Sequence, residues 1–294
     1  MKSGVIAVVG RANAGKSSLI NVLVGEKISI VSPKPQTTRD RILGILNEED
    51  YQMVFVDTPG MYKADNVLNA YMQKTVEESQ KDVDVILLVI DVHEGLKRSD
   101  IANLEKFSKG KIKPIVALTK IDIMPEKELI MELGRLSEYN LDIVPVSARK
   151  NKNLKELKKV ILSYLPEGDR LYDENIISDK SEKFMIAEIM REKLLLKFDE
   201  EIPHGTAIIV NTFKLKDNGV YDINLDIICE KQNHKAILIG RGGKAIKEAS
   251  SFARESMEKF LGRKVFLTTY VKVKENWRDN NSLIKEFGYK ENNE

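Results

Sequence analysis

The feature that most constrains the fold of this sequence is a glycine-rich segment near its start, residues 10–17, which reads G-R-A-N-A-G-K-S. It ends an apolar run, Val5–Gly10, and opens a helix-like stretch, Lys16–Leu23. Glycines let the backbone wrap around an anion with its N–H groups pointing inward, and the N-terminus of the helix adds a favourable dipole. The spacing G-x-x-x-x-G-K-S at a strand-to-helix turn therefore predicts a phosphate-binding loop.

The rest of residues 1–165 alternates apolar runs with amphipathic segments such as Glu126–Glu138 and Leu154–Tyr164. This alternation predicts an α/β domain with a mostly parallel six-stranded sheet and helices on both faces. A tight polar break at residues 48–50 predicts a hairpin, and hence one antiparallel edge strand. The predicted strands of the parallel part are Val5–Gly10, Met53–Asp57, Val83–Asp91, Pro114–Thr119 and Asp142–Val146.

The second half has a different order of elements. Pro166, Gly168 and several acids predict a linker over residues 166–180, followed by a helix, Asp179–Phe198, with Asp179 as its N-cap. Two strands joined by a turn at Asp217–Gly219 come next, and then a short helix and a glycine cluster. A helix, Lys244–Leu261, and a strand, Val265–Val273, complete an α-β-β-α-α-β domain over residues 181–275, which leaves residues 276–294 as a tail.

Composition limits the class of protein. The chain has 294 residues, 42% of them apolar and 31% charged, which is typical of a globular protein of about two domains. The single cysteine, Cys229, excludes an internal disulfide and fits a reducing compartment. The longest aliphatic stretch, Val85–Ile90, is too short to span a bilayer, and no export signal follows the first apolar run. We therefore expect a soluble intracellular protein.

Charge is distributed unevenly. The chain carries a net charge of only +2, yet residues 231–274 hold eleven Lys or Arg against three Asp or Glu, a local charge of +8. The remainder must then carry −6. A basic second domain beside an acidic first one is the electrostatic pattern of a nucleic-acid-binding module.

Three further motifs follow predicted strands of the first domain. In Asp57–Gly60, the carboxylate can hold Mg²⁺ through a water and the Gly60 N–H can reach a γ-phosphate. In Thr119–Asp122, the carboxylate of Asp122 can accept hydrogen bonds from N1–H and N2–H₂ of guanine. Adenine offers no such pair of donors, so this site would reject it. Ser147–Arg149 can present a backbone N–H to guanine O6.

With these motifs in this order, residues 10–149 resemble the P-loop GTPases, which bind GTP or GDP with Mg²⁺. The sequence departs from their commonest N-K-x-D motif, because Thr119 replaces the asparagine. The implied metal ligands are Ser17, Asp57 through a water, and either Thr37 or Thr38, between which the sequence does not decide. The candidate nucleotide-binding residues are Gly10, Arg11, Ala12, Asn13, Ala14, Gly15, Lys16, Ser17, Ser18, Gln36, Thr37, Thr38, Asp57, Thr58, Pro59, Gly60, Thr119, Lys120, Ile121, Asp122, Ser147, Ala148 and Arg149.

Hydrolysis would lack one common device. Met61 stands where Ras-like proteins carry the glutamine that orients the attacking water, so we expect slow intrinsic turnover. No side-chain general base can be named. Stabilisation of the transition state is expected from Lys16, from Gly60, and from Asn13, which resembles the asparagine that helps bacterial GTPases hold K⁺ near the phosphates.

The second domain carries a nucleic-acid signature. Residues 239–246 resemble the KH motif I-G-x-x-G-x-x-I, whose loop between two helices clamps the backbone of about four nucleotides. The order α-β-β-α-α-β is that of an α+β type II KH domain, and KH modules take single strands, with RNA the expected target rather than DNA. The candidate RNA-binding residues are Ile239, Gly240, Arg241, Gly242, Gly243, Lys244, Ile246 and Lys247.

A GTPase domain followed by this KH domain resembles the Era family of bacterial ribosome-assembly GTPases over nearly the whole chain. The shared segments include Gln36–Arg39, Arg191–Lys193 and the tail Trp277–Tyr289. The resemblance implies binding of the 3′ end of 16S rRNA and a role in 30S subunit maturation. It also implies a cytoplasmic monomer with a peripheral contact to the inner membrane face, although no free basic amphipathic helix demands that contact.

Other functions stay open at this point. The chain could be a constitutive RNA-binding protein whose nucleotide is structural, a related non-ribosomal GTPase, or, least favoured, an ATPase. In the tail, Trp277 and Tyr289 could stack on RNA or cap the KH core, and we expect capping.

Overall fold

The computed structural model describes residues 1–60, 65–93 and 95–289, and the chain divides into two compact units. The first unit comprises Met1–Val31, Thr38–Tyr62 and Met72–Asp179. The second comprises Ser32–Thr37, Lys63–Tyr71 and Lys180–Glu294. Two short segments from the first half of the chain therefore belong to the second unit.

The first unit is built on a six-stranded sheet in the order β2-β3-β1-β4-β5-β6. Strand β2 is antiparallel to β3, and all other neighbours are parallel, as the sequence predicted. The continuous apolar runs predicted this, because a parallel sheet is covered on both faces. The strands are β1 (Lys2–Val9), β2 (Ile42–Asn47), β3 (Tyr51–Asp57), β4 (Val85–Asp91), β5 (Ile115–Thr119) and β6 (Ile143–Pro145).

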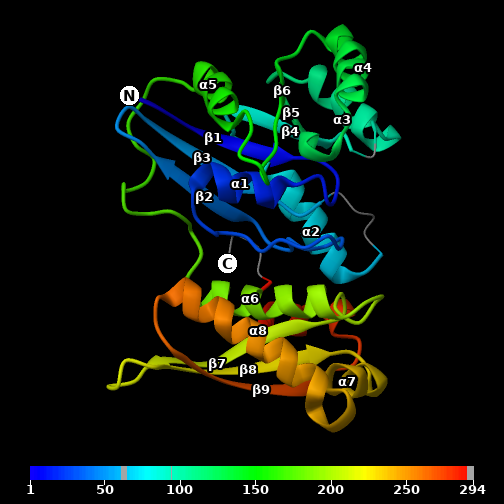
Figure 1. Cartoon of the computed structure of the whole chain (residues 1–294), viewed down its shortest axis with the longest axis vertical. Coiled ribbons are helices and arrows are strands. Elements are labelled where there is room, and N and C mark those ends of the chain that lie inside the picture. The colour runs from blue at the N-terminus through cyan, green and yellow to red at the C-terminus, as the bar shows by residue number, and fades with distance from the viewer. Residues whose placement is uncertain (61–64, 94, 290–294) are drawn as a thin grey trace. The chain divides into compact units, whose positions relative to one another are not determined.

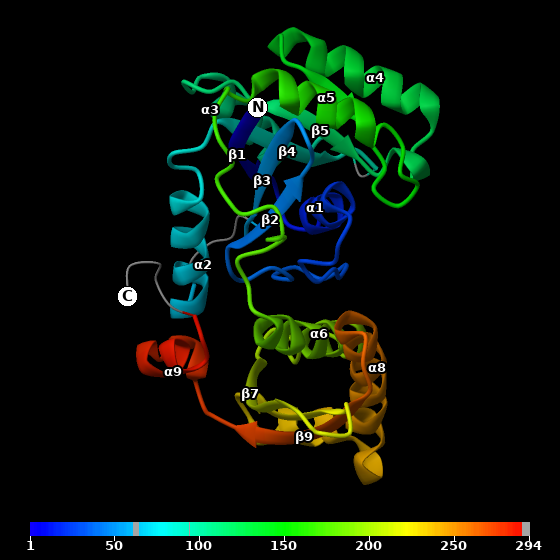
Figure 2. The same cartoon turned by 90° about the vertical axis from the view of Figure 1, so that its left-hand side faces the viewer.

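Helices cover both faces of this sheet, with α1 on one side and α2 on the other (Figure 2). Leu104, Phe107 and Leu136 pack with β4 and β5 in one apolar cluster, so α3 and α4 share a face. The helices are α1 (Lys16–Val24), α2 (Val67–Glu78), α3 (Arg98–Ser108), α4 (Glu126–Leu136) and α5 (Leu154–Tyr164), with short 3₁₀ turns η1 (Ile121–Ile123) and η2 (Ser137–Tyr139). The start of α2, up to Tyr71, is counted with the second unit.

The segment after α5 is tied to the edge of this sheet by one buried side chain. The Gln52 Oε1 accepts hydrogen bonds from the backbone N–H of Leu171 and Tyr172, at 2.7 and 3.0 Å, and its Nε2 donates to the Tyr172 carbonyl at 2.7 Å. The backbone N–H of Ile45 donates to the Ile177 carbonyl at 2.9 Å. Residues 166–179 therefore cover the edge strand β2, which would otherwise present unpaired backbone groups.

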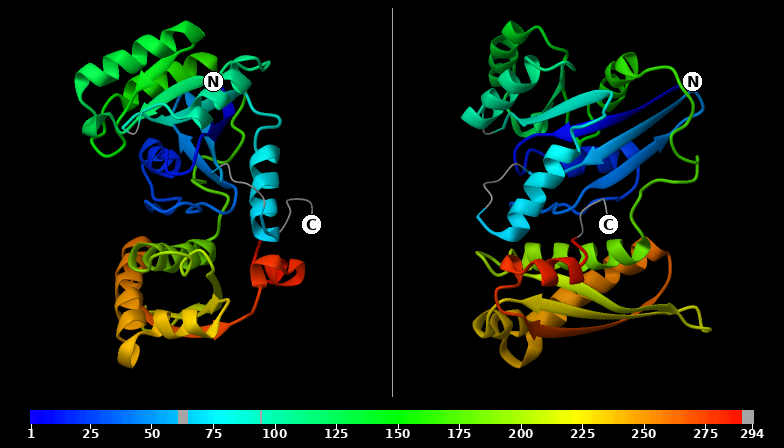
Figure 3. Two further views of the ribbon diagram at one scale, coloured as in Figure 1. Left: turned by 90° about the vertical axis from the view of Figure 1, so that its right-hand side faces the viewer. Right: turned by 180° about the vertical axis from the view of Figure 1, so that it is seen from behind.

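The second unit has the predicted α-β-β-α-α-β order. Its three-stranded sheet runs β7-β8-β9, with β7 antiparallel and β9 parallel to β8. Helices α6 and α8 pack against one face of it in a single apolar core (Figures 1 and 3). The elements are α6 (Glu182–Lys197), β7 (Ala207–Leu215), β8 (Tyr221–Cys229), α7 (Gln232–Ile239), η3 (Arg241–Gly243), α8 (Lys244–Leu261), β9 (Val265–Val273), η4 (Trp277–Asp279) and α9 (Asn281–Glu286).

The predicted start of α6 was wrong by three residues. Helix α6 begins at Glu182, and its N-cap is Ser181, whose hydroxyl accepts a hydrogen bond from the Phe184 N–H at 3.2 Å. Asp179 belongs instead to the first unit, where its carboxylate accepts from the Leu43 N–H at 2.8 Å. Asp and Ser are both good N-caps. The contact of Asp179 with Leu43 therefore determines that Ser181 caps the helix.

The tail completes the core of the second unit. Trp277 is fully buried, and its indole N–H donates to the Gly205 carbonyl at 3.0 Å. The Tyr289 ring stacks on Trp277 with centroids 6.2 Å apart, and Phe287 meets it edge-on at 5.5 Å. These contacts support the expectation that the tail aromatics cap the KH domain, which stays a prediction.

Within the described ranges, no helix combines the length and the apolar character needed to cross a bilayer.

Replacement of Ser181 by Ala should destabilise the second unit by about 1 kcal/mol, because the N-cap acceptor is lost. Trp277 is the only tryptophan, so its fluorescence reports the melting of this unit alone. We expect its transition to fall by about 4–8 °C. Asp179→Ala is the matched control and should leave the Trp277 transition in place; an equal loss from both variants would contradict the assignment of the cap.

Candidate functional site

The glycine-rich loop is held close to the backbone of β4. Gly10 has φ +150°, and a Cβ added there would collide with the Val89 carbonyl oxygen. Gly15, the N-cap of α1, has φ +93°, a left-handed conformation that side chains disfavour. Both positions therefore require glycine, and together they open the N-terminus of α1 towards a bound anion.

Lys16 is folded back over this loop. Its buried ammonium group donates to the carbonyls of Gly10 and Arg11, at 3.1 and 3.0 Å. Burial lowers the pKa of Lys16 to about 8, although the carboxylate of Asp57 opposes this shift. The Lys16 ammonium is buried among carbonyl oxygens, and the Asp57 carboxylate offsets the cost of burying its charge only in part. Such a cation is well suited to bind a negatively charged phosphate.

Oxygen atoms gather beside the loop in an arrangement that suits Mg²⁺. The hydroxyls of Ser17 and Thr38 lie 2.9 Å apart. Asp57 ends β3 fully buried, with no partner at ordinary hydrogen-bond geometry for either carboxylate oxygen. Burial raises its pKa, while the nearby Ser17 hydroxyl and the Lys16 ammonium lower it. Hard cations prefer such oxygens, so this group of hydroxyls and one buried carboxylate fits Mg²⁺.

Gly60 also lies against the phosphate loop. A Cβ added at Gly60 would come within 2.9 Å of the Ala12 Cα and 3.0 Å of its backbone nitrogen. A side chain at this position would therefore push the segment after β3 away from the loop. Thr58 fixes the same segment to β1, because its hydroxyl donates to the Val8 carbonyl at 3.1 Å.

Thr119 stands where the commonest form of this motif has asparagine, and its hydroxyl forms two structural hydrogen bonds. Its buried hydroxyl donates to the Ala14 carbonyl at 2.6 Å, and to the Ile90 carbonyl at 3.2 Å. The end of β5 is thereby tied both to the phosphate loop and to β4. The position that carries asparagine in the commonest form of this motif thus supplies a buried donor to the loop in this chain.

The predicted base-reading residues are joined by a hydrogen bond. The Ser147 hydroxyl donates to the Asp122 carboxylate at 2.6 Å and accepts from the Lys150 N–H at 3.0 Å. This contact orients Asp122 from a loop that follows a different strand.

Two acidic residues that bind basic side chains of this site were not predicted from the sequence. Asp91, at the end of β4, receives the Lys120 ammonium at 2.6 Å, and its carbonyl accepts from Arg11 at 3.2 Å. Asp100, on α3, pairs with the Arg11 guanidinium at 3.2 Å. Burial raises the pKa of Asp100, and Arg11 opposes that shift. The position of Asp91 at a strand end beside the phosphate loop is the signal that could have identified it.

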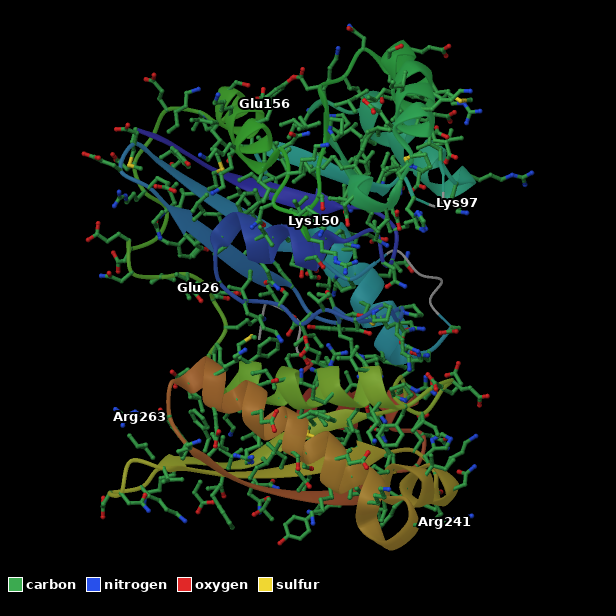
Figure 4. The ribbon with its side chains drawn as sticks, viewed as in Figure 1. Glu26, Lys97, Lys150, Glu156, Arg241 and Arg263 are labelled. Atoms are coloured by element: carbon green, nitrogen blue, oxygen red, sulfur yellow. The ribbon has the colours of Figure 1, made fainter. Side chains whose placement is uncertain are left out.

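The second unit presents its glycine loop between α7 and α8. Gly240 has φ +72°, and a Cβ there would lie 2.7 Å from the Ala245 Cβ, so the two helices meet too closely for a side chain. Arg241, Lys244 and Lys247 are exposed around this loop, and Arg241 lies at the end of the unit where α7 and α8 meet (Figure 4). Ile239 and Ile246 are half-buried, and Gly242 and Gly243 have positive φ.

Comparison with known proteins identifies both domains. The model of the family "50S ribosome-binding GTPase" matches residues 5–120, and that of the KH domain matches residues 201–278. GTPase Era of Clostridium kluyveri is 46% identical over 99% of this chain and 100% of its own length. GTPase Era of Clostridium botulinum is also 46% identical, over 98% of both chains. This chain belongs to the GTPase Era family. It is therefore an enzyme that hydrolyses GTP.

Two solved structures of Era share the fold over 98% of this chain and 99% of their own, at 41% identity. One is a variant from Aquifex aeolicus bound to GDP·AlF₄⁻, with a TM-score of 0.92. The other is an Era in complex with MgGDPNP and nucleotides 1506–1542 of 16S ribosomal RNA, with a TM-score of 0.93. The predicted combination of a GTPase fold with a KH fold is thus confirmed.

The structure distributes the remaining predicted nucleotide-binding residues over two units. Thr38 lies beside Ser17, whereas Gln36 and Thr37 belong to the second unit, where the Thr37 hydroxyl donates to the Lys34 carbonyl at 2.7 Å. Asn13 is exposed, with φ +60°. Met61 lies outside the described residues. Ser18 lies in the first turn of α1, and Ile121 begins η1. The others occupy the loops described above: Ala12, Ala14, Pro59, Ala148 and Arg149.

Thr119→Val should weaken GDP binding about tenfold, because the Ala14 carbonyl would lose a buried donor and the loop would be less well held. Titration with a fluorescent GDP analogue measures this. Thr119→Ser, which keeps the hydroxyl, should stay within about threefold of the parent protein. Equal affinities for the Val variant and the parent would show that the hydrogen bond to Ala14 does not support the nucleotide site.

Proposed function

We propose that this Era-family GTPase is a nucleotide-controlled switch that binds the 3′ end of 16S rRNA and assists maturation of the 30S subunit. The observation that carries the proposal is the similarity, over 98% of the chain, to an Era bound to MgGDPNP and 16S rRNA nucleotides 1506–1542. The glycine loops of both units support it, because each has the backbone geometry that its ligand requires.

In this proposal the first unit binds the nucleotide through residues that are already preorganised. The α1 N-terminus and Lys16 hold the β- and γ-phosphates, the Gly60 N–H reaches the γ-phosphate, and Asp122 reads guanine while Ser147 orients it. A site built for guanine donors disfavours adenine nucleotides, which argues against an ATPase.

The metal ligands would be Ser17, Thr38 and, through a water, Asp57. Of the two threonines left open by the sequence, Thr38 is favoured because its hydroxyl lies 2.9 Å from that of Ser17, whereas the Thr37 hydroxyl is engaged with the Lys34 carbonyl. Bound Mg²⁺ would neutralise charge on the β- and γ-phosphates. The buried oxygens of Asp57 give it a counter-charge at the end of β3.

K⁺ would supply further positive charge near the phosphates through Asn13. In support, Asn13 occupies an exposed, left-handed position in the phosphate loop. Hydrolysis measured in K⁺ should exceed hydrolysis in Na⁺ by about tenfold or more, since one well-placed charge lowers a barrier by several kcal/mol. Asn13→Ala should remove the difference between the two ions. Equal rates in K⁺ and Na⁺ for the parent protein would exclude this role.

The second unit would clamp the RNA backbone at Gly240–Gly243. The exposed Arg241, Lys244 and Lys247 would add phosphate contacts, and the half-buried Ile239 and Ile246 would form the floor of the groove. Because these contacts rely on charge, the affinity should fall as salt rises. Because the proposed partner is 16S rRNA, we place the protein in the cytoplasm, as a monomer. A peripheral contact with the inner membrane face stays a prediction.

Fluorescence anisotropy with a short RNA matching the 3′ end of 16S rRNA tests the switch. The protein is loaded in turn with GDP and with GDPNP, and we expect tighter binding with GDPNP by about fivefold or more, the lower end of common allosteric couplings. Equal binding would favour the alternative of a constitutive RNA-binding protein with a structural nucleotide. An absence of binding in both states, beside normal binding of nucleotide, would contradict the rRNA assignment.

A further inference from the structure

Helix α6 of the second unit buries an arginine that neither proposed ligand site uses. Only 1% of the Arg191 side chain is exposed, although it carries a full charge. Its guanidinium pairs with the Glu188 carboxylate one turn earlier, with Nε donating to Oε1 at 2.7 Å and Nη2 to Oε2. The Glu188 charge raises the pKa of Arg191 against the effect of burial. Burying such a pair is expensive unless its remaining donors are satisfied.

Those remaining donors go to a segment far away in the sequence. Arg191 Nη1 donates to the Gln36 carbonyl at 3.3 Å, and Nη2 donates to the next carbonyl, that of Thr37. Both acceptors belong to Ser32–Thr37, which forms part of the same compact unit as α6. One guanidinium thus holds two successive carbonyls of a loop, while Glu188 fixes its orientation.

A second contact fixes the start of the same segment. The Lys34 ammonium donates to the Phe198 carbonyl and pairs with the Asp199 carboxylate at 2.8 Å, just after α6 ends. Cations are favoured at this end of a helix. Gln36 has φ +57°, an uncommon conformation for a residue with a side chain, and its amide donates to Asn69 at 3.1 Å. The segment is therefore held in one defined conformation from Lys34 to Thr37.

The next residue in the chain is Thr38, whose hydroxyl lies 2.9 Å from that of Ser17 in the phosphate site. The chain therefore passes from the second unit to the first between Thr37 and Thr38. The peptide group that Arg191 holds at Thr37 is the one directly bonded to Thr38. A shift of that carbonyl must move the Thr38 backbone, because the peptide group is planar and rigid.

We infer that Arg191, oriented by Glu188, is a positioning residue that holds the Gln36 and Thr37 carbonyls so that Thr38 can reach the metal and γ-phosphate site. This rests on the proposed function. In this role, the Arg191 guanidinium would couple the nucleotide state to the RNA-binding unit. If Thr38 engages the metal only when a γ-phosphate is bound, as in GTPase switch loops, Arg191 would favour GTP over GDP without touching either nucleotide.

Replacement of Arg191 by Gln tests the inference in two separate assays. In the first, without RNA, the affinity for GDPNP should fall about tenfold, the usual effect of losing a charge-assisted hydrogen bond, while the affinity for GDP stays within about twofold. In the second assay, the RNA affinity is measured with each nucleotide bound. The ratio of the affinity of the GDPNP-loaded protein to that of the GDP-loaded protein should fall towards one, because coupling is reciprocal. Arg191→Lys should recover part of both effects.

Two further variants make the result decisive. Glu188→Gln leaves the cation but removes the carboxylate that orients it, and we expect the same split between GDPNP and GDP at about threefold. Arg254→Gln removes an arginine of the same unit that pairs with Glu258 one turn later, and it should change neither assay. The Trp277 fluorescence transition confirms that each variant is folded.

Different results would contradict the positioning role of Arg191 and the proposed nucleotide-controlled switch. Folded Arg191→Gln and Glu188→Gln proteins that bind GDPNP and GDP like the parent would overturn the positioning role, whatever the RNA does. If the parent protein binds RNA equally in both nucleotide states, the proposed switch is wrong. A GDPNP-specific loss in Arg191→Gln would still support the positioning of Thr38 in that case.

Discussion

The close approach of backbone to backbone around the phosphate loop is the constraint on which the rest of the first unit depends. Gly10 lies against the carbonyl of Val89, and Gly60 lies against Ala12, at distances that no side chain could tolerate. These contacts bring the ends of three neighbouring strands, β1, β3 and β4, to one point. The N-terminus of α1 opens at that point, so an anion that binds there meets several elements at once.

Hydroxyl groups then hold the adjoining loops in register. Thr119 joins the end of β5 to the phosphate loop, and Ser147 joins the last strand-end loop to Asp122. Both bonds join segments that are distant in the sequence, and both are directed, so they can preorganise a site without a large apolar surface. The base-reading end and the phosphate end of the site are in this way parts of one connected network.

Much of this was predictable from the sequence, and the exceptions share a cause. The mostly parallel sheet with its antiparallel edge strand and the α-β-β-α-α-β order of the second unit followed from apolar periodicity and turn residues, because these depend on local chemistry. The N-cap of α6 was misassigned because Asp179 and Ser181 are equally good caps, and only the contact with Leu43 separates them. The roles of Asp91 and Arg191 depend on contacts across about 30 to 150 residues of chain, which periodicity does not reveal.

The central claim is that the segment before Thr38 links the nucleotide state to the RNA-binding unit. Amide hydrogen exchange of a peptide spanning residues 32–41 in the parent protein tests it most directly, with GDP and then GDPNP, each with and without the 16S rRNA oligonucleotide. The account predicts that GDPNP slows exchange in this peptide and that RNA slows it further only when GDPNP is bound. Exchange that is the same with both nucleotides, with or without RNA, would contradict it.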